Sequence, residues 1–122
     1  MPLFDKFMAA ERRRRTVADS IVDNLRNILN VKREYGSLWP DLGIRSLTEY
    51  RSREGIAAAV MDDVRQNIEH YEPRLRLDEI VLEQGDSPFR LSFSVRCSLV
   101  GGSQMLQVSF DTVFGTCDVM RR

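Results

Sequence analysis

A strict alternation of apolar and polar residues between positions 89 and 99 limits the possible folds of this chain more than any other feature. The apolar set is Phe89, Leu91, Phe93, Val95, Cys97 and Leu99, and the residues between them are Arg90, Ser92, Ser94, Arg96 and Ser98. Successive side chains of a strand point to opposite faces, so this pattern predicts a strand with one buried face and one wet face. Gly101 and Gly102 then predict a hairpin turn. Beyond it, the inward face of a return strand is predicted to carry Leu106, Val108, Phe110 and Phe114.

A third strand is predicted directly after Pro73. Leu75 and Leu77 are at odd-numbered positions and share one face, whereas Ile80 and Leu82 are at even-numbered positions and share a face. A change of parity inside a strand indicates an extra residue in the ladder, so we expect a bulge or bend near Asp78 and Glu79. The three predicted strands leave edges that an isolated protein would have to protect.

The first half of the chain has helical spacing instead. From Thr16 to Asn30 apolar residues recur every three or four positions, at Val17, Ile21, Leu25, Ile28 and Leu29. A second helix, capped by Ser52 or Thr48, is predicted to end near Tyr71 because Pro73 disfavours the helical conformation at Glu72. Residues 31–47 collect turn formers, and we expect a loop that Tyr35 and Trp39 pin to the core. Helices followed by strands predict an α+β fold, with N-terminal helices packed on one face of a C-terminal antiparallel sheet.

Composition narrows the classes of function. The 122 residues suit a single domain spanning 1–122. Eighteen basic and eighteen acidic residues cancel, so no global field attracts nucleic acid. No apolar run approaches the roughly 20 residues that cross a bilayer, and the opening residues do not resemble a secretory signal. Both observations favour a cytoplasmic protein without direct membrane insertion. Cys97 and Cys117 lack zinc-binding spacing, so we expect reduced thiols and neither a metal nor a cofactor.

Residues 1–15 are predicted to form a short N-terminal docking segment. Its apolar stripe consists of Leu3, Phe4, Phe7 and Met8 at helical spacing. Such a short stripe is not stable alone, so it docks either on its own domain or on a partner. The run Arg12 to Arg15 suits either a phosphate-binding patch, with binding that weakens steeply in salt, or the solvated start of the next helix. The lack of interleaved aromatic residues favours the solvated helix.

The residues where the second helix meets the first strand are the strongest candidates for a binding site. In an extended segment, residues i and i+2 point the same way, so Glu72 and Arg74 are predicted to project together towards charged partners. Arg76 continues that face, and Pro73 fixes the corner. The predicted partner-binding residues are therefore Glu72, Pro73, Arg74 and Arg76. The alternative is an internal ion pair that only stabilises the corner.

Several segments, in this order and spacing, carry a family resemblance. They are Pro2-Leu3-Phe4-Asp5-Lys6-Phe7, the helix end from Asn24-Leu25 to Ile28-Leu29-Asn30, Asp41-Leu42-Gly43-Ile44, Glu72-Pro73-Arg74-Leu75 and Val108-Ser109-Phe110-Asp111-Thr112. Together they resemble TssE, the baseplate wedge component of type VI secretion systems, and its counterpart in contractile phage tails. The sequence departs from the family pattern at three places. It has Val31-Lys32 where the family usually has Thr-Arg, Leu42 where it has Tyr, and Arg45 where it has Pro.

The resemblance implies a non-catalytic part that links the baseplate wedge to the first ring of the contractile sheath and supports sheath assembly. It makes Glu72, Pro73 and Arg74 the family's functional hallmark. The implied partners are wedge proteins of the TssF, TssG and TssK type and sheath subunits of the TssB and TssC type, with an edge strand accepting a partner strand. The implied location is the cytoplasm, associated with the membrane through the assembled baseplate. A type VI apparatus, a phage tail and an extracellular injection particle all remain possible settings.

The family has also carried a lysozyme-like label, which makes a glycoside hydrolase acting on peptidoglycan the alternative function. Such an enzyme needs two carboxyl groups flanking a cleft. The acids clustered near the corner are Glu69, Glu72, Asp78 and Glu79. A neighbouring Arg74 lowers the pKa of Glu72, whereas a general acid needs a raised pKa, so we expect a protein that is not an enzyme.

Overall fold

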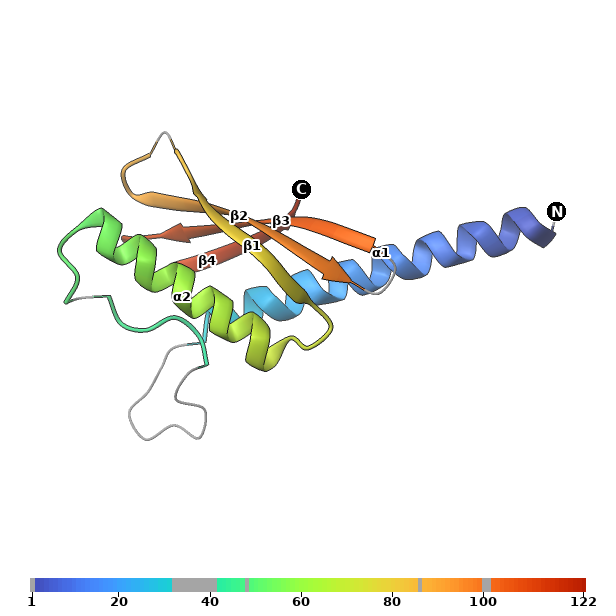
Figure 1. Ribbon diagram of the computed structural model, residues 1–122, viewed down its shortest axis with the longest axis horizontal. Helices are drawn as coiled ribbons and strands as arrows, with labels where there is room; N and C mark the ends of the chain where they lie inside the picture. Colours follow the sequence, from blue (N-terminus) through green and yellow to red (C-terminus); the bar gives the residue numbers. More distant parts are fainter. Residues whose placement is uncertain (1, 32–41, 48, 86, 100–101) are drawn as a thin grey trace.

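The computed structural model describes residues 2–31, 42–47, 49–85, 87–99 and 102–122. It places two helices before four strands: α1 Pro2–Leu29, α2 Arg53–Tyr71, β1 Arg76–Glu83, β2 Arg90–Leu99, β3 Gly102–Asp111 and β4 Thr116–Arg121. Figure 1 shows both helices on the same side of the sheet. The predicted α+β fold is therefore confirmed. Predictions for Tyr35, Trp39, Thr48 and Gly101 fall outside the described residues.

The sheet is an antiparallel meander in the order β1-β2-β3-β4. The register of β1 against β2 shifts between Leu77 and Glu79, so the predicted bulge is confirmed. The inward alternation of β2 is also confirmed, since Leu91, Phe93, Val95 and Cys97 are fully buried. On β3 the corresponding buried residues are Leu106, Val108 and Phe110.

Two aromatic residues predicted to face inward do not. Phe89 is 60% exposed and Phe114 is 79% exposed, because β2 begins only at Arg90 and β3 ends at Asp111. Three strands were predicted, and β4, the far edge of the sheet, was not recognised as a separate fourth strand. Its inward residues are Cys117 and Val119, and two apolar positions within six residues are too short a pattern to predict a strand.

Helix α1 is longer than the spacing predicted. One continuous helix runs from Pro2 to Leu29, and its N-terminal half projects beyond the sheet (Figure 1). The segment predicted to dock separately is thus part of α1, while the side chains of Leu3, Phe4 and Phe7 lie outside the described part. Ala18 is the first buried residue among the α1 positions whose burial the structure describes, and Val17, predicted to face inward, is 45% exposed. Neither helix combines the length and apolarity that a membrane span needs within the described residues.

Helix α2 begins and ends where the sequence indicated. The side chain of Ser52 accepts a hydrogen bond from the Gly55 amide, which confirms Ser52 as the N-cap. Val60, Val64 and Ile68 are almost completely buried against the sheet. Each such side chain contributes roughly 1.5–3 kcal/mol through removal from water.

Two polar residues of α2 are also fully buried, and both bind the segment that precedes the helix. Asn67 donates to the Gly43 carbonyl at 3.0 Å and accepts from the Gly43 amide at 2.7 Å. Asp63 accepts from the amide and the guanidinium of Arg45, at 2.9 and 2.7 Å. The backbone at Gly43 has a φ of 82°, and a Cβ there would lie 2.0 Å from the Val31 carbonyl oxygen. Residues 42–45 are therefore fixed to the helix through buried hydrogen bonds.

Candidate functional site

The corner between α2 and β1 is a tight turn. Glu72 ends the helix with its amide bonded to the Ile68 carbonyl, and the Leu75 amide donates to the Glu72 carbonyl at 3.1 Å. Pro73 occupies the second position of this turn, where its fixed φ is favoured. Strand β1 begins only at Arg76, so the predicted extended conformation from Glu72 is wrong, and the turn instead folds Arg74 back onto Glu72.

The Glu72 carboxylate faces the interior and forms three short hydrogen bonds. The residue is 1% exposed. The Nε and Nη2 of Arg74 donate to its two oxygens at 2.6 and 2.8 Å, a bidentate pairing. The Nδ2 of Asn24 on α1 donates to Oε2 at 2.5 Å. The carboxylate is thereby paired and hydrogen-bonded, as a buried charge has to be.

The same corner is tied to α1 through Arg74. Its Nη1 donates to the Ser20 hydroxyl at 3.3 Å, and Ser20 lies one turn before Asn24 on the same helix face. Sequence reasoning missed Ser20 and Asn24 as members of this site. The sequence did contain one signal: Ser20 and Asn24 are four residues apart, next to the buried positions Ile21 and Leu25. The sequence of one helix does not show, however, which distant side chain the helix contacts.

Burial and hydrogen bonding act in opposite directions on the pKa of Glu72. Burial raises this pKa, but the hydrogen bonds from Arg74 and Asn24, with the positive charge of Arg74, bring it below the ordinary value of 4.5. The pKa of Arg74 is raised by its hydrogen bond to Glu72. The pair is therefore charged at neutral pH, and Glu72 does not have the raised pKa of a general acid.

The four predicted partner-binding residues divide into one internal and three outward-facing residues. Glu72 is inside, whereas Pro73 and Arg76 are exposed and the Arg74 side chain is 45% exposed. Arg76 forms no ion pair with the described residues. Arg76 therefore presents an outward-facing positive charge at the corner, where the exposed carboxylates of Glu69 and Asp78 also lie.

The other acids near the corner do not assemble a pair with Glu72. Asp78 accepts a hydrogen bond from Ser98 at 2.6 Å, and Glu79 forms an ion pair with Arg96 at 3.1 Å. Glu69 is exposed on α2. The described residues contain no cluster of three or more His, Cys, Asp or Glu side chains able to hold a metal ion.

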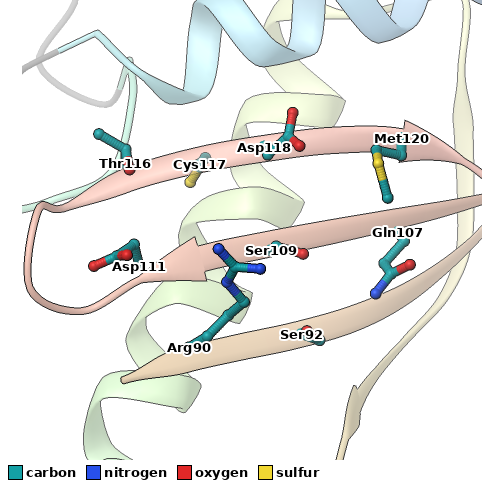
Figure 2. Close-up of a pocket in the computed structure, with 9 residues that line it drawn as sticks. All are labelled: Arg90, Ser92, Gln107, Ser109, Asp111, Thr116, Cys117, Asp118 and Met120. Carbon is teal, nitrogen blue, oxygen red and sulfur yellow. The ribbon is translucent and has the colours of Figure 1, made fainter. Parts of the chain in front are cut away.

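The outer face of the sheet contains an open polar trough of about 300 Å³. Figure 2 shows its lining, which comes from β2, β3 and β4: Arg90, Ser92, Gln107, Ser109, Asp111, Thr116, Cys117, Asp118 and Met120. Its two carboxylates already have partners, since Asp111 accepts from the Val113 and Phe114 amides and Asp118 accepts from Arg26. The trough therefore presents serine and glutamine side chains on a shallow surface rather than a pair of free carboxyl groups.

The two edges of the sheet differ in their hydrogen bonding. On β4, Asn30 donates to the Cys117 carbonyl and accepts from the Cys117 amide, both at 2.8 Å. Arg26 donates to the Val119 carbonyl at 2.6 Å. Arg26 of α1 and Asn30, directly after α1, thus occupy outer backbone groups of Cys117 and Val119, which hinders the addition of a partner strand along this part of β4.

On β1, the backbone of Arg76–Glu83 receives no hydrogen bond from a described side chain. The bulge between Leu77 and Glu79 interrupts the first part of this edge, which leaves Glu79–Glu83 as the regular stretch. Charged residues and bulges are the usual protection of an edge against indiscriminate pairing. Among the described residues, the edge at β4 is therefore covered at Cys117 and Val119, whereas the edge at β1 is open.

Comparison with protein families identifies the group to which this fold and corner belong. Residues 15–103 match the model of the family described as baseplate wedge protein gp25. The chain belongs to this gp25 family. A solved protein described as a tail lysozyme from Geobacter sulfurreducens has a similar fold, with a TM-score of 0.60, 18% sequence identity, and coverage of 78% of this chain and 90% of that one. No curated protein matches the sequence significantly.

Membership of the gp25 family confirms the resemblance to baseplate wedge proteins of the TssE and phage-tail type. It makes the chain a structural baseplate protein of the phage-tail kind. The matched region includes Asn24, Glu72 and Arg74, so the whole hydrogen-bonded corner lies within it. It begins after the first half of α1 and ends at the start of β3, so the β3–β4 hairpin lies beyond it.

Proposed function

We propose that this chain joins the baseplate wedge to the first ring of the contractile sheath in an injection machine of the type VI secretion kind. The observation that carries the proposal is the difference between the two sheet edges. Only β1 offers a regular stretch of unoccupied backbone among the described strands, because Arg26 and Asn30 cover part of β4. A sheath strand added to β1 would extend the sheet by main-chain hydrogen bonds.

The corner supplies the second contact in this proposal. Glu72 acts as an internal brace, and the partner meets Pro73, Arg74 and Arg76 on the outside. A guanidinium that is held by two hydrogen bonds has little conformational freedom left to lose on binding, which favours a precise contact. A carboxylate on a wedge or sheath subunit is the matching group for Arg76, which faces outward and has no ion pair within the described part of the chain.

The projecting half of α1 is the third contact. Residues 2–15 continue the helix beyond the sheet, and Met8 on this half is 38% exposed. A helix that extends past its own domain gains most of its stability from packing against another surface. We therefore place residues 1–15 against a wedge protein of the TssF or TssG type.

Copurification tests the proposal. The chain is coexpressed with wedge and sheath subunits of a type VI system. The variants are Arg74→Ala and Arg76→Ala, and the control is Arg65→Ala, which changes an exposed arginine of α2. We expect the two corner variants to lose sheath or wedge subunits while their circular dichroism stays native. Hydrogen exchange on addition of sheath subunit is expected to slow at β1 amides and to leave β4 unchanged.

Two results would overturn the proposal. One is a folded chain that retains none of the wedge and sheath subunits, and the other is protection at β4 instead of β1. Simple loss of thermal stability in Arg74→Ala, with assembly unchanged, would mean that the ion pair only stabilises the corner.

The second candidate function is hydrolysis of peptidoglycan, favoured by the similarity to the protein described as a tail lysozyme. The buried carboxylate of Glu72 is the acid to test, although its lowered pKa opposes a role as general acid. Turnover of purified peptidoglycan by the wild type that disappears in Glu72→Gln would establish this function in place of the structural one.

A further inference from the structure

Three of the most exposed large apolar side chains lie at one end of the molecule. Phe114 is 79% exposed, Val113 is 64% exposed and Phe89 is 60% exposed. Val113 and Phe114 form the tip of the β3–β4 hairpin, and Thr112 links that tip to Phe89 by two hydrogen bonds, of 2.8 Å from its amide and 2.9 Å from its hydroxyl. We call these three residues the apolar tip.

The backbone that carries the apolar tip is held in place. The Asp111 carboxylate accepts from the Val113 amide at 2.8 Å and from the Phe114 amide at 2.9 Å, and the Asp111 carbonyl accepts from the Gly115 amide at 2.8 Å. Gly115 has a φ of 68°, a conformation that glycine adopts without strain. A fixed turn presents Phe114 in a defined position, and such preorganisation favours binding.

A hollow of about 530 Å³ lies directly beside the tip. One wall is Val113 and Phe114, and the other is formed by Ile44, Leu47 and Ile56, which are only partly buried. A projecting aromatic side chain and an apolar hollow therefore share one face of the molecule. A surface with both features is complementary to itself under a twofold rotation.

We propose that this face binds a second copy of the chain, with Phe114 of each copy seated in the hollow of the other. The apolar tip exposes about 350–400 Å² per copy, on the basis of roughly 200 Å² for a phenylalanine side chain. With the hollow walls, two copies together bury on the order of 1,000 Å², near the lower limit of specific interfaces. The predicted dimer is thus weak and depends on concentration.

Charge does not oppose this association. The chain has equal numbers of acidic and basic residues and no net charge, so two copies do not repel each other as a whole. The rim of the hollow carries Arg45, whose charge is balanced by Asp62 and Asp63 at 3.0 and 2.7 Å. Val113 and Phe114 lie outside the part that matches the gp25 family, whereas Phe89 and the residues Ile44, Leu47 and Ile56 of the hollow lie inside it. The face does not include the edge of β1, so this inference is separate from the proposed sheath contact.

Sedimentation velocity across about 1 to 500 μM tests the dimer, because a weak interface near the lower size limit is expected to associate only at micromolar concentrations. We expect the wild type to shift from monomer to dimer with concentration. Phe114→Asp and Val113→Asp are expected to remain monomeric with native circular dichroism. The matched control is Met120→Asp, which changes a 48% exposed residue on the outer sheet face and is expected to dimerise like the wild type.

Disulfide trapping tests the arrangement of the two copies. Ser46 is an exposed residue of the hollow, so we expect a mixture of Phe114→Cys and Ser46→Cys to form a mixed disulfide dimer. Ser103 lies at the opposite end of β3, so we expect no mixed disulfide between Phe114→Cys and Ser103→Cys. A wild type that stays monomeric at the highest concentration overturns the proposal. So does a dimer that persists in Phe114→Asp, since another surface would then hold it.

Discussion

The guanidinium of Arg74 binds the buried carboxylate of Glu72 through two hydrogen bonds, although only Pro73 separates the two residues. The turn at Pro73 makes this possible, because an extended chain would carry both side chains outward. Asn24 of α1, which lies 48 residues earlier in the sequence, donates a third hydrogen bond to the Glu72 carboxylate. A motif that looks like a surface feature in the sequence is therefore partly an internal brace between helix and sheet.

Acid is expected to destabilise the wild type more than Glu72→Gln. The pKa of Glu72 is lowered in the folded state, so its contribution to stability is present above the ordinary value of 4.5 and is lost as the pH falls through the folded pKa. At neutral pH we expect Glu72→Gln to lower the free energy of unfolding by about 1–3 kcal/mol. Urea unfolding above and below pH 4.5 measures both effects. The control is Glu69→Gln on the exposed face of α2, and an identical acid response in wild type and Glu72→Gln would contradict the prediction.

Gly43→Ala is expected to be far more destabilising than Gly115→Ala. Both glycines have positive φ, at 82° and 68°, so alanine introduces comparable backbone strain of about 1 kcal/mol at each. At Gly43 the new Cβ would also overlap the Val31 carbonyl, whereas nothing lies within 4 Å at Gly115. We expect a loss of about 3 kcal/mol or more at Gly43, measured by thermal or urea unfolding. Equal losses would show that the contact with Val31 is not tight.

Asn30→Ala is expected to open the β4 edge. The change removes the two hydrogen bonds to Cys117 and the bond of 2.7 Å to the Arg26 carbonyl, at an expected cost of about 1–3 kcal/mol. The freed edge is expected to pair with other chains and to increase aggregation, followed by light scattering on gentle heating. Asn27→Ala, an exposed change on α1 three residues before Asn30, serves as the control. If both variants aggregate alike, Asn30 does not protect the edge.

The two cysteines are expected to react slowly with thiol reagents in the folded protein. Burial, with a smaller effect from the charge of Asp78, raises the pKa of Cys97 to about 11, and burial raises the pKa of Cys117 to about 12. Thiolate is therefore scarce below pH 9, and access is blocked as well. We expect both thiols to react promptly only after unfolding, with a Ser103→Cys variant showing one fast thiol in the native state. Fast labelling of the folded wild type would contradict the burial of both residues.

The strands and helices with long, regular patterns could be predicted, whereas their ends and their mutual contacts could not. The alternation in β2 determined which side is buried because each inward position meets the core. That rule failed at Phe89 and Phe114, which lie past the strand ends and beyond the cover of the helices. Strand β4 was missed because six residues are too few for a pattern, and it is stabilised by pairing with β3 and by contacts from α1.

The amino-acid sequence by itself determined the α+β class, the bulge in β1, the cap at Ser52 and the special character of the corner at Pro73, since each depends on residues close together in the chain. Only the tertiary structure decided that Glu72 faces inward, that Ser20 and Asn24 bind the corner, and that the edge at β4 is partly covered while the edge at β1 is open. These contacts join residues tens of positions apart, and their geometry is fixed by packing that no local pattern encodes.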